Sequence, residues 1–183
     1  ALVSRRPAPR RALAPLDRPL DSRQLRTALL DSVAREGTIG SARAQHVMVR
    51  DPQTVAPSTT VWAALALMRQ GDLRHLPVVD DDGTLRGILS NRDFRRLLDF
   101  LDPEGRIPHV RDIVVSEIMT KMPQVITAHP DTPVVNIARL MVMRKVGAMP
   151  IVDAQRRVVG ILTQKDVLRE LLRQLAPTPL DLS

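Results

Sequence analysis

The chain contains no cysteine, which excludes disulfide bonds, thiolate metal sites and thiol nucleophiles. Aromatic side chains are almost as scarce, because Trp62, Phe94 and Phe100 are the only ones. Any core must therefore be aliphatic, with methionine filling its gaps. No stretch approaches 18 uninterrupted apolar residues, and the arginine pairs near the N-terminus precede no apolar segment. We therefore expect a cytoplasmic protein with neither a membrane span nor a secretory signal.

Positive charge is concentrated at one end of the chain. Residues 1–43 carry nine arginines against four acidic residues, a net charge of +5, whereas residues 44–183 carry 18 basic and 16 acidic residues, a net charge of +2. A nucleic-acid-binding domain normally has a basic face on its folded part. No nucleic-acid partner is therefore expected for the folded part, although the arginine-rich leader leaves a nucleic-acid-associated regulator open as an alternative.

Two near-copies of one phrase dominate the rest of the chain. "LPVVDDDGTLRGILSNRD" at 76–93 returns as "MPIVDAQRRVVGILTQKD" at 149–166. From Pro57 and Pro130 onward the copies align with a constant offset of 73, with 14 identities over 57–98. Before these prolines the offset is 71, so the second copy has a two-residue insertion. A similarity of this length in constant register indicates an internal repeat.

Each copy predicts the element order β-α-β-β-α. A short apolar run ("TVA" or "VITA") precedes a helix, then a hairpin turns at "DDDGT" or "DAQRR", and a second helix follows. The apolar face of that second helix is expected to consist of Phe94, Leu97, Leu98 and Leu101 in the first copy and Val167, Leu168, Leu171, Leu172 and Leu175 in the second. One unit of this size buries too little surface to be stable alone. We therefore predict an α/β fold of two pseudo-symmetric repeats, packed together so that they form two equivalent clefts.

The flanking segments complete the predicted organisation. A helix is expected from Asp21 to Gly37, with Leu25, Leu29 and Val33 on one face. The predicted boundaries are 1–20 for a flexible Arg/Pro-rich arm, 21–43 for this helix and a linker, 44–101 for repeat 1, 102–114 for a linker, 115–175 for repeat 2, and 176–183 for a tail.

The phrase "GILSNRD" combines residue types that could bind a nucleoside phosphate. Gly87 would end a strand where a ligand or another backbone comes close. Ser90 stands at a helix N-cap, where free N–H groups favour an anion such as phosphate. Asp93, one turn into the helix, could accept hydrogen bonds from the vicinal hydroxyls of a ribose, and Arg92 could add positive charge for phosphate.

The second copy repeats this arrangement, and a simpler interpretation accompanies it. Its equivalent residues are Gly160, Thr163, Lys165 and Asp166. Ser/Thr-x-x-Asp before an apolar helix is also an ordinary capping arrangement, which contributes about 0.5–2 kcal/mol. Capping alone does not require the whole phrase to be repeated in register, so the ligand-binding interpretation is preferred.

The paired pattern h-P-V-V-D … G-I-L-S/T-x-x-D resembles a tandem of CBS domains, over roughly residues 44–175. The resemblance implies clefts that bind an adenosine-containing ligand such as AMP, ADP, ATP or S-adenosylmethionine. It also implies a non-catalytic regulatory module that acts on an enzyme, channel or transporter and commonly forms a homodimer. No further cofactor is implied. A structural or oligomerisation module with empty clefts is the second alternative.

The resemblance also assigns roles to individual residues. Asp93 and Asp166 match the ribose-binding aspartate, Ser90 and Thr163 the neighbouring hydroxyl, and Ile88 and Ile161 the apolar contact with the base or ribose. Arg74 and His75 match phosphate-contacting basic residues, whereas the second copy has Val146, Gly147 and Ala148 around that point. The candidate ligand set is therefore Arg74, His75, Ile88, Ser90, Arg92, Asp93, Val146, Gly147, Ile161, Thr163, Lys165 and Asp166. We expect the Asp93 cleft to suit a multiply charged nucleotide, and the Asp166 cleft a less charged ligand or none.

Motifs for other functions are absent from the sequence. "DDDG" at 80–83 lacks the later ligands of a calcium loop and fits a hairpin turn. The four histidines have no spacing typical of zinc ligands. No phosphate-binding loop, nucleophile elbow, zinc-protease or dinucleotide motif occurs. Neither catalytic residues nor a metal site are therefore predicted.

Overall fold

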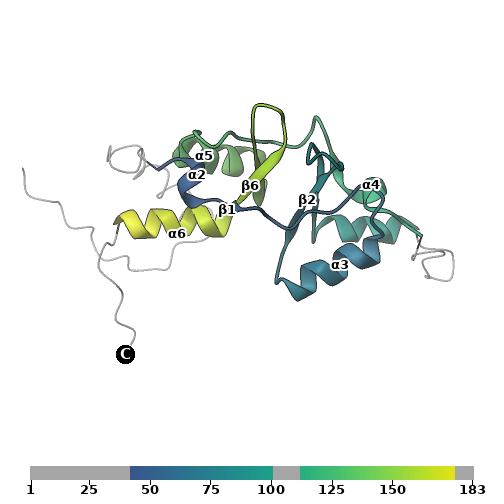
Figure 1. The fold of residues 1–183 in the computed structure, drawn as a ribbon. Helices are drawn as coiled ribbons and strands as arrows, with labels where there is room; N and C mark the ends of the chain where they lie inside the picture. Colours follow the sequence, from purple (N-terminus) through teal and green to yellow (C-terminus); the bar gives the residue numbers. More distant parts are fainter. Residues whose placement is uncertain (1–41, 101–111, 176–183) are drawn as a thin grey trace, which may run out of the picture.

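The computed structural model describes residues 42–100 and 112–175, and Figure 1 shows two lobes that lie side by side. The arginine-rich arm, the helix expected from Asp21 to Gly37 and the C-terminal tail lie outside the described residues. No helix within the two described ranges is long and apolar enough to cross a membrane. The same ranges contain no group of three histidine, aspartate or glutamate side chains that could hold a metal ion.

Each lobe consists of one hairpin with two helices. The first contains α3 (Val61–Gln70), β2 (His75–Val79), β3 (Leu85–Ser90) and the 3-10 helix η1 (Asp93–Phe100). The second contains α5 (Val134–Arg144), β5 (Ala148–Val152), β6 (Val158–Thr163) and α6 (Gln164–Leu175). Both hairpins are antiparallel and have a register shift at the same repeat position, between Val78 and Val79 and between Ile151 and Val152. The predicted α/β repeat is therefore confirmed, with equivalent irregularities in both copies.

The first segment of each repeat joins the sheet of the other repeat. These segments are α2 (Ala44–Val47) with β1 (Val49–Arg50), and α4 (Val115–Ile118) with β4 (Thr120–Lys121). Strand β1 pairs with β6, and β4 pairs with β3, so the sheet orders are β1-β6-β5 and β2-β3-β4. In Figure 1 the blue α2 accordingly lies among the green and yellow elements of the second lobe. The two copies therefore exchange their leading strands.

This exchange corrects the expected first strand of each repeat. The runs "TVA" and "VITA" form no regular strand, because Val55 makes a single bridge to Val78 and Ala128 a single bridge to Ile151. The regular two-residue strands come earlier in the chain. Their partners are supplied by the other repeat, which a pattern within one copy could not indicate.

The exchange also explains Gly87 and Gly160, which lie within β3 and β6 rather than at the strand ends. A Cβ atom on Gly87 would lie 2.6 Å from the backbone oxygen of Thr120. A Cβ atom on Gly160 would collide with the Met48 sulfur and lie 3.1 Å from the backbone oxygen of Val49. The sequence left open whether a ligand or another backbone comes close to these glycines, and the structure shows another backbone.

The two hairpin turns meet at a pseudo-two-fold axis. The Leu85 N–H donates to the Arg156 carbonyl, and the Val158 N–H donates to the Gly83 carbonyl, each at 3.1 Å. Val158 is the second-copy equivalent of Leu85, and Arg156 is that of Gly83, so the two hydrogen bonds are equivalent to each other at the offset of 73. Thr84 forms a β-bridge with its own equivalent, Arg157. The repeats are therefore joined by backbone hydrogen bonds as well as by the exchanged strands.

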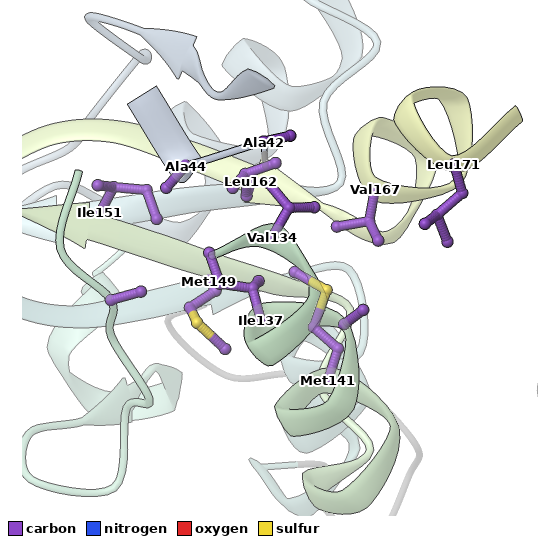
Figure 2. Close-up of a cluster of buried hydrophobic side chains, with 12 residues drawn as sticks. Ala42, Ala44, Val134, Ile137, Met141, Met149, Ile151, Leu162, Val167 and Leu171 are labelled. Carbon is purple, nitrogen blue, oxygen red and sulfur yellow. The ribbon is translucent and has the colours of Figure 1, made fainter. Parts of the chain in front are cut away.

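The cores are aliphatic and rich in methionine, as the composition predicts. In the second lobe Ile137, Met141 and Met149 are almost wholly buried. Figure 2 shows this cluster, in which Ala42 and Ala44 from the leading segment pack with residues of α5, β5, β6 and α6. A small third cluster, with Leu85 from one hairpin and Val152 from the other, lies between the repeats.

The last helix of each repeat differs from its expected form. In the first copy it is a 3-10 helix, with Phe94 and Leu97 packed against the core. Leu98 and Leu101 lie beyond what the structure describes for side chains. In the second copy Val167 and Leu171 point into the core in Figure 2. The five residues expected on one face do not all enter the core, because Leu168 and Leu172 are 47% and 55% exposed. Leu175 has no described side chain.

Candidate functional site

The Ser90–Asp93 turn lies where β3 ends and η1 begins. Asp93 Oδ2 accepts a hydrogen bond from the Ser90 N–H at 2.7 Å and one from the Ser90 hydroxyl at 2.8 Å. The aspartate is buried, with 7% of its surface exposed. One carboxylate oxygen thus closes the strand-to-helix junction and fixes the direction in which Asp93 points.

The second repeat builds the same junction. Asp166 Oδ2 accepts from the Thr163 N–H at 3.0 Å and from the Thr163 hydroxyl at 2.6 Å. Its other oxygen, Oδ1, accepts a longer hydrogen bond from exposed Arg169 at 3.3 Å. In the second copy the Asp166 N–H also donates to the Thr163 hydroxyl at 3.4 Å, which completes a capping arrangement at the start of α6. In the first copy both Ser90 hydrogen bonds end on the Asp93 carboxylate, at the start of η1. Ligand binding by these aspartates remains a proposal.

Basic side chains gather beside the first of these junctions. His75 is the β-sheet partner of Ser90, and the Asn91 N–H donates to the Arg74 carbonyl at 3.1 Å. Burial lowers the pKa of His75, the positive charge of Arg92 lowers it further, Asp93 opposes the shift, and Arg74 adds to it. The structure thus brings together the five predicted residues Arg74, His75, Ser90, Arg92 and Asp93.

The lowered pKa of His75 predicts a pH dependence of stability. Below the ordinary value of 6.5 the unfolded chain takes up a proton at His75 before the folded chain does. The free energy of unfolding should therefore fall as the pH drops below about 6.5, until the folded histidine also titrates. His75→Ala introduces the residue found at the equivalent position of the second copy, Ala148. It should reduce the slope of the free energy of unfolding against pH by the contribution of up to one proton. Urea unfolding between pH 5 and 8 measures it.

The control for this pH dependence is Met143→Gln, which replaces a side chain that is 74% exposed and has no titratable group. The free energy of unfolding of this variant should keep the wild-type slope against pH. An unchanged slope in His75→Ala would contradict the assignment of the pH dependence to the buried imidazole.

The His75 ring also contacts the second repeat. A Cβ atom on Gly147 would lie 3.1 Å from both Cε1 and Nε2 of the imidazole. Gly147 is the equivalent of Arg74, so the ring of His75 crowds the position from which a second arginine side chain would extend. This contact gives a physical reason for the absence of a basic pair in the second copy.

The remaining predicted residues differ in accessibility. Ile88 is half-buried, but Ile161 is buried with 7% exposed, so little of its surface is open to a ligand. Lys165 is exposed at the start of α6. Half-buried Val146 accepts a hydrogen bond through its carbonyl from the Gln164 side chain at 3.1 Å. The structure therefore gathers Val146, Thr163 and Asp166 around the junction of β6 and α6.

The sequence analysis missed two residues beside the predicted sites, Asn91 and Gln164. The Asn91 N–H donates to the Arg74 carbonyl, and the Gln164 N–H donates to the Gly147 carbonyl at 3.0 Å. Both bonds tie the helix start to the beginning of the first hairpin strand. Both bonds are donated by backbone N–H groups, which every residue except proline has, so the residue type gave no signal for them.

A groove of about 390 Å³ opens next to the first junction, between α3 and η1. Its lining residues are Leu65, Met68, Arg69, Asp72, Leu73, Arg74, Asn91 and Phe94. It shares Arg74 with the predicted ligand set but is not lined by Ser90 or Asp93. The groove thus belongs to one repeat, and it adjoins the basic cluster at Arg74 and Asn91.

Comparison with known proteins matches both repeats to one family model. The model described as "CBS domain" matches residues 44–99 and 115–173. A CBS domain-containing protein of Dictyostelium discoideum is 36% identical over 139 residues, which cover 74% of this chain and 94% of that protein. Inosine-5'-monophosphate dehydrogenase of Mycobacterium bovis is 35% identical over 134 residues, 73% of this chain. The chain spans 23% of the length of that enzyme.

Solved structures give the same result. CBSX2 in complex with AMP superposes with a TM-score of 0.62 and 32% identity, over 73% of this chain and 98% of that one. A CBS domain pair in complex with 5′-methylthioadenosine and S-adenosyl-L-methionine superposes with a TM-score of 0.59 and 31% identity. It covers 70% of this chain and 94% of the other.

Proposed function

The chain belongs to the CBS domain family as a tandem pair, and from this premise we propose that it is a non-catalytic sensor of an adenosine-containing ligand. The observation that carries the proposal is the gathering of Arg74, His75 and Arg92 around the Ser90–Asp93 junction. Neither arginine forms an ion pair within the described residues, so both are available to an anion. Related pairs crystallised with AMP and with S-adenosyl-L-methionine support an adenosine ligand.

The proposed binding mode assigns one part of the ligand to each kind of group. The aspartate carboxylates accept hydrogen bonds from the ribose hydroxyls. The phosphates lie against Arg74, Arg92 and His75, where guanidinium groups give strong charge-assisted hydrogen bonds. Ile88, half-buried in β3, contacts the base or the ribose.

The two sites differ in the charge that they can neutralise. The second copy offers Lys165 and Arg169 near Asp166, but its equivalent of Arg74 is Gly147. We therefore propose that the Asp93 site takes a nucleotide with several phosphates, whereas the Asp166 site takes a less charged ligand or stays empty. Titration calorimetry that finds two equal ATP sites would exclude this asymmetry.

Signal transmission follows from differential affinity. A ligand shifts the equilibrium between two arrangements of the repeats only if it binds one arrangement more tightly. We propose that a homodimer or a regulated enzyme or transporter reads that shift in the cytoplasm. Similarity to a dehydrogenase over this part alone supports a regulatory role rather than a catalytic one.

The proposal predicts stabilisation by a nucleotide. A ligand present at a hundred times its dissociation constant adds about 2.7 kcal/mol to the free energy of unfolding. For a chain of this size the midpoint of thermal unfolding should rise by roughly 5–11 °C. AMP, ADP, ATP, S-adenosylmethionine and NAD are compared by differential scanning fluorimetry with wild type, Asp93→Ala and Asp166→Ala.

Each variant is compared with its own ligand-free midpoint, because loss of a capping carboxylate lowers stability by itself. Arg74→Ala should reduce the shift given by ATP more than the shift given by an uncharged adenosine. Arg69→Ala, which lines the groove outside the basic cluster, is the matched control. No shift with any ligand would favour the alternative of a structural module, in which the aspartates serve as caps alone.

A further inference from the structure

The groove between α3 and η1 is a second candidate site, distinct from the Ser90–Asp93 junction. Its volume of about 390 Å³ lies within the range of pockets that bind small molecules, about 300–1,000 Å³. Half of its lining side chains are apolar and half are polar: Leu65, Met68, Leu73 and Phe94, and Arg69, Asp72, Arg74 and Asn91. An apolar lining with a few polar groups is typical of a site that orients a small ligand.

Positive charge dominates the polar part of this groove. The side chains of Arg69, Asp72 and Arg74 are exposed, and within the described residues no ion pair involves any of them. Two guanidinium groups and one carboxylate leave a net charge of +1, which one negative charge on a ligand neutralises. Guanidinium groups bind a carboxylate through charge-assisted hydrogen bonds, so the groove suits a monocarboxylate better than a polyphosphate.

Apolar surface continues from this charged end along α3, which lies at the lower edge of the first lobe in Figure 1. Leu65 lies one turn before Arg69, and Trp62 lies one turn before Leu65, so the three side chains share one side of the helix. Trp62 is the only tryptophan of the chain and is 66% exposed. A charged end followed by an apolar strip matches a ligand that has the same two parts.

The repeat does not account for this combination. At the offset of 73, Arg69 corresponds to Val142. Arg74 corresponds to Gly147, so the second copy lacks both positive charges. In that copy α5 and α6 pack against each other, whereas the first copy ends in the 3-10 helix η1. The charged groove is therefore a property of the first repeat and not of the common fold.

We propose that the groove between α3 and η1 binds a small-molecule carboxylate that carries an apolar chain. The carboxylate accepts hydrogen bonds from Arg69 and Arg74, and the chain lies against Leu65 and Phe94 and extends toward Trp62. This site needs no nucleotide, so it is independent of the proposed sensor function, although Arg74 belongs to both sites.

Isothermal titration calorimetry of the full chain with octanoate at pH 8, where the carboxylate is ionised, tests the proposal. Octan-1-ol supplies the chain without the charge, and acetate supplies the charge without the chain. Octanoate should bind at one site per chain and at least roughly tenfold more tightly than octan-1-ol, because hydrogen bonds between charged groups are lost with the alcohol. Acetate should show no measurable binding, and octanoate should change the fluorescence of Trp62.

Two variants locate the binding site. Arg69→Val introduces the residue of the second copy and should weaken octanoate binding at least roughly tenfold, while the affinity for octan-1-ol stays the same. Arg139→Ala is the matched control, because it replaces an exposed arginine of α5 with the residue that the first copy carries, Ala66. It should bind octanoate as tightly as the wild type does.

Three results would overturn the proposal: no octanoate binding by the wild type, equal affinities for octanoate and octan-1-ol, or full octanoate affinity in Arg69→Val. The first two need no variant, so they hold even if a substitution impairs folding. If a second copy of the chain covers the groove instead, the affinity for octanoate should fall as the protein concentration rises. Light scattering should then show a lower mass for Arg69→Val than for the wild type, which would also contradict a small-molecule site.

Discussion

Gly160→Ala is expected to lower the free energy of unfolding by about 1–3 kcal/mol, although it adds a single methyl group. The added Cβ would collide with the sulfur of Met48, which precedes β1, and would approach the backbone oxygen of Val49 to 3.1 Å. Because β1 comes from the other repeat, the substitution should weaken the exchanged strand in particular. Urea unfolding measures the loss, and hydrogen exchange at Val49 and Arg50 locates it.

The two repeats provide a matched control for this prediction. Met48→Ala should restore part of the loss in Gly160→Ala, because it removes the side chain that the new methyl group meets. Met119→Ala should restore less in Gly87→Ala, since the backbone oxygen of Thr120 would still lie 2.6 Å from the new Cβ. If both methionine substitutions restored the same share of the lost stability, the contact with the Thr120 backbone would not be the main cause of the loss in Gly87→Ala.

Leu162→Ala is expected to lower the free energy of unfolding by about 2–5 kcal/mol, and Leu89→Ala by a similar amount. Both side chains are wholly buried, and the two leucines occupy equivalent positions on β6 and β3. Each lies in a core of its own, so the substitution leaves a cavity that the neighbouring side chains fill only in part. Differential scanning calorimetry and urea unfolding measure the loss.

Neither leucine variant should split the transition into two. The exchanged strands and the hydrogen bonds between the turns tie the lobes together, so a loss in one core should lower the stability of the whole. Calorimetric and van't Hoff enthalpies should therefore agree in both variants. Two resolved transitions would show that the repeats unfold separately. Met143→Ala, which changes a side chain that is 74% exposed, is the control and should stay within about 0.5 kcal/mol of wild type.

Local patterns predicted much of the fold because each depends on a few neighbouring residues. The alternation around "LPVVDDDGTLRGIL" specifies a hairpin, and β2 and β3 form it. The Ser-x-x-Asp spacing places a carboxylate one turn beyond a hydroxyl, which is the geometry of Ser90 and Asp93. Repetition at a fixed offset then doubles each element, so the second lobe follows from the first.

Contacts between the repeats could not be predicted in the same way. Nothing within one copy indicates that β1 pairs with β6, because the partner lies more than a hundred residues away. The contact of the His75 ring with Gly147 depends equally on how the lobes meet. Exposure of Leu168 and Leu172 was missed because a helical pattern shows which residues share a side but not how much of that side the rest of the protein covers.

The sequence by itself determined the repeated unit, its hairpin, the helix before the hairpin and the aspartates that accept hydrogen bonds from Ser90 and Thr163, since these arise from side-chain period and hydrogen bonding over a few residues. The tertiary structure alone decided which strand completes each sheet and why Gly87 and Gly160 admit no side chain. It also decided that the basic cluster forms beside Asp93, where His75 packs against the second repeat. These features depend on the pseudo-two-fold packing of the two lobes, and packing between distant segments leaves no period in a sequence.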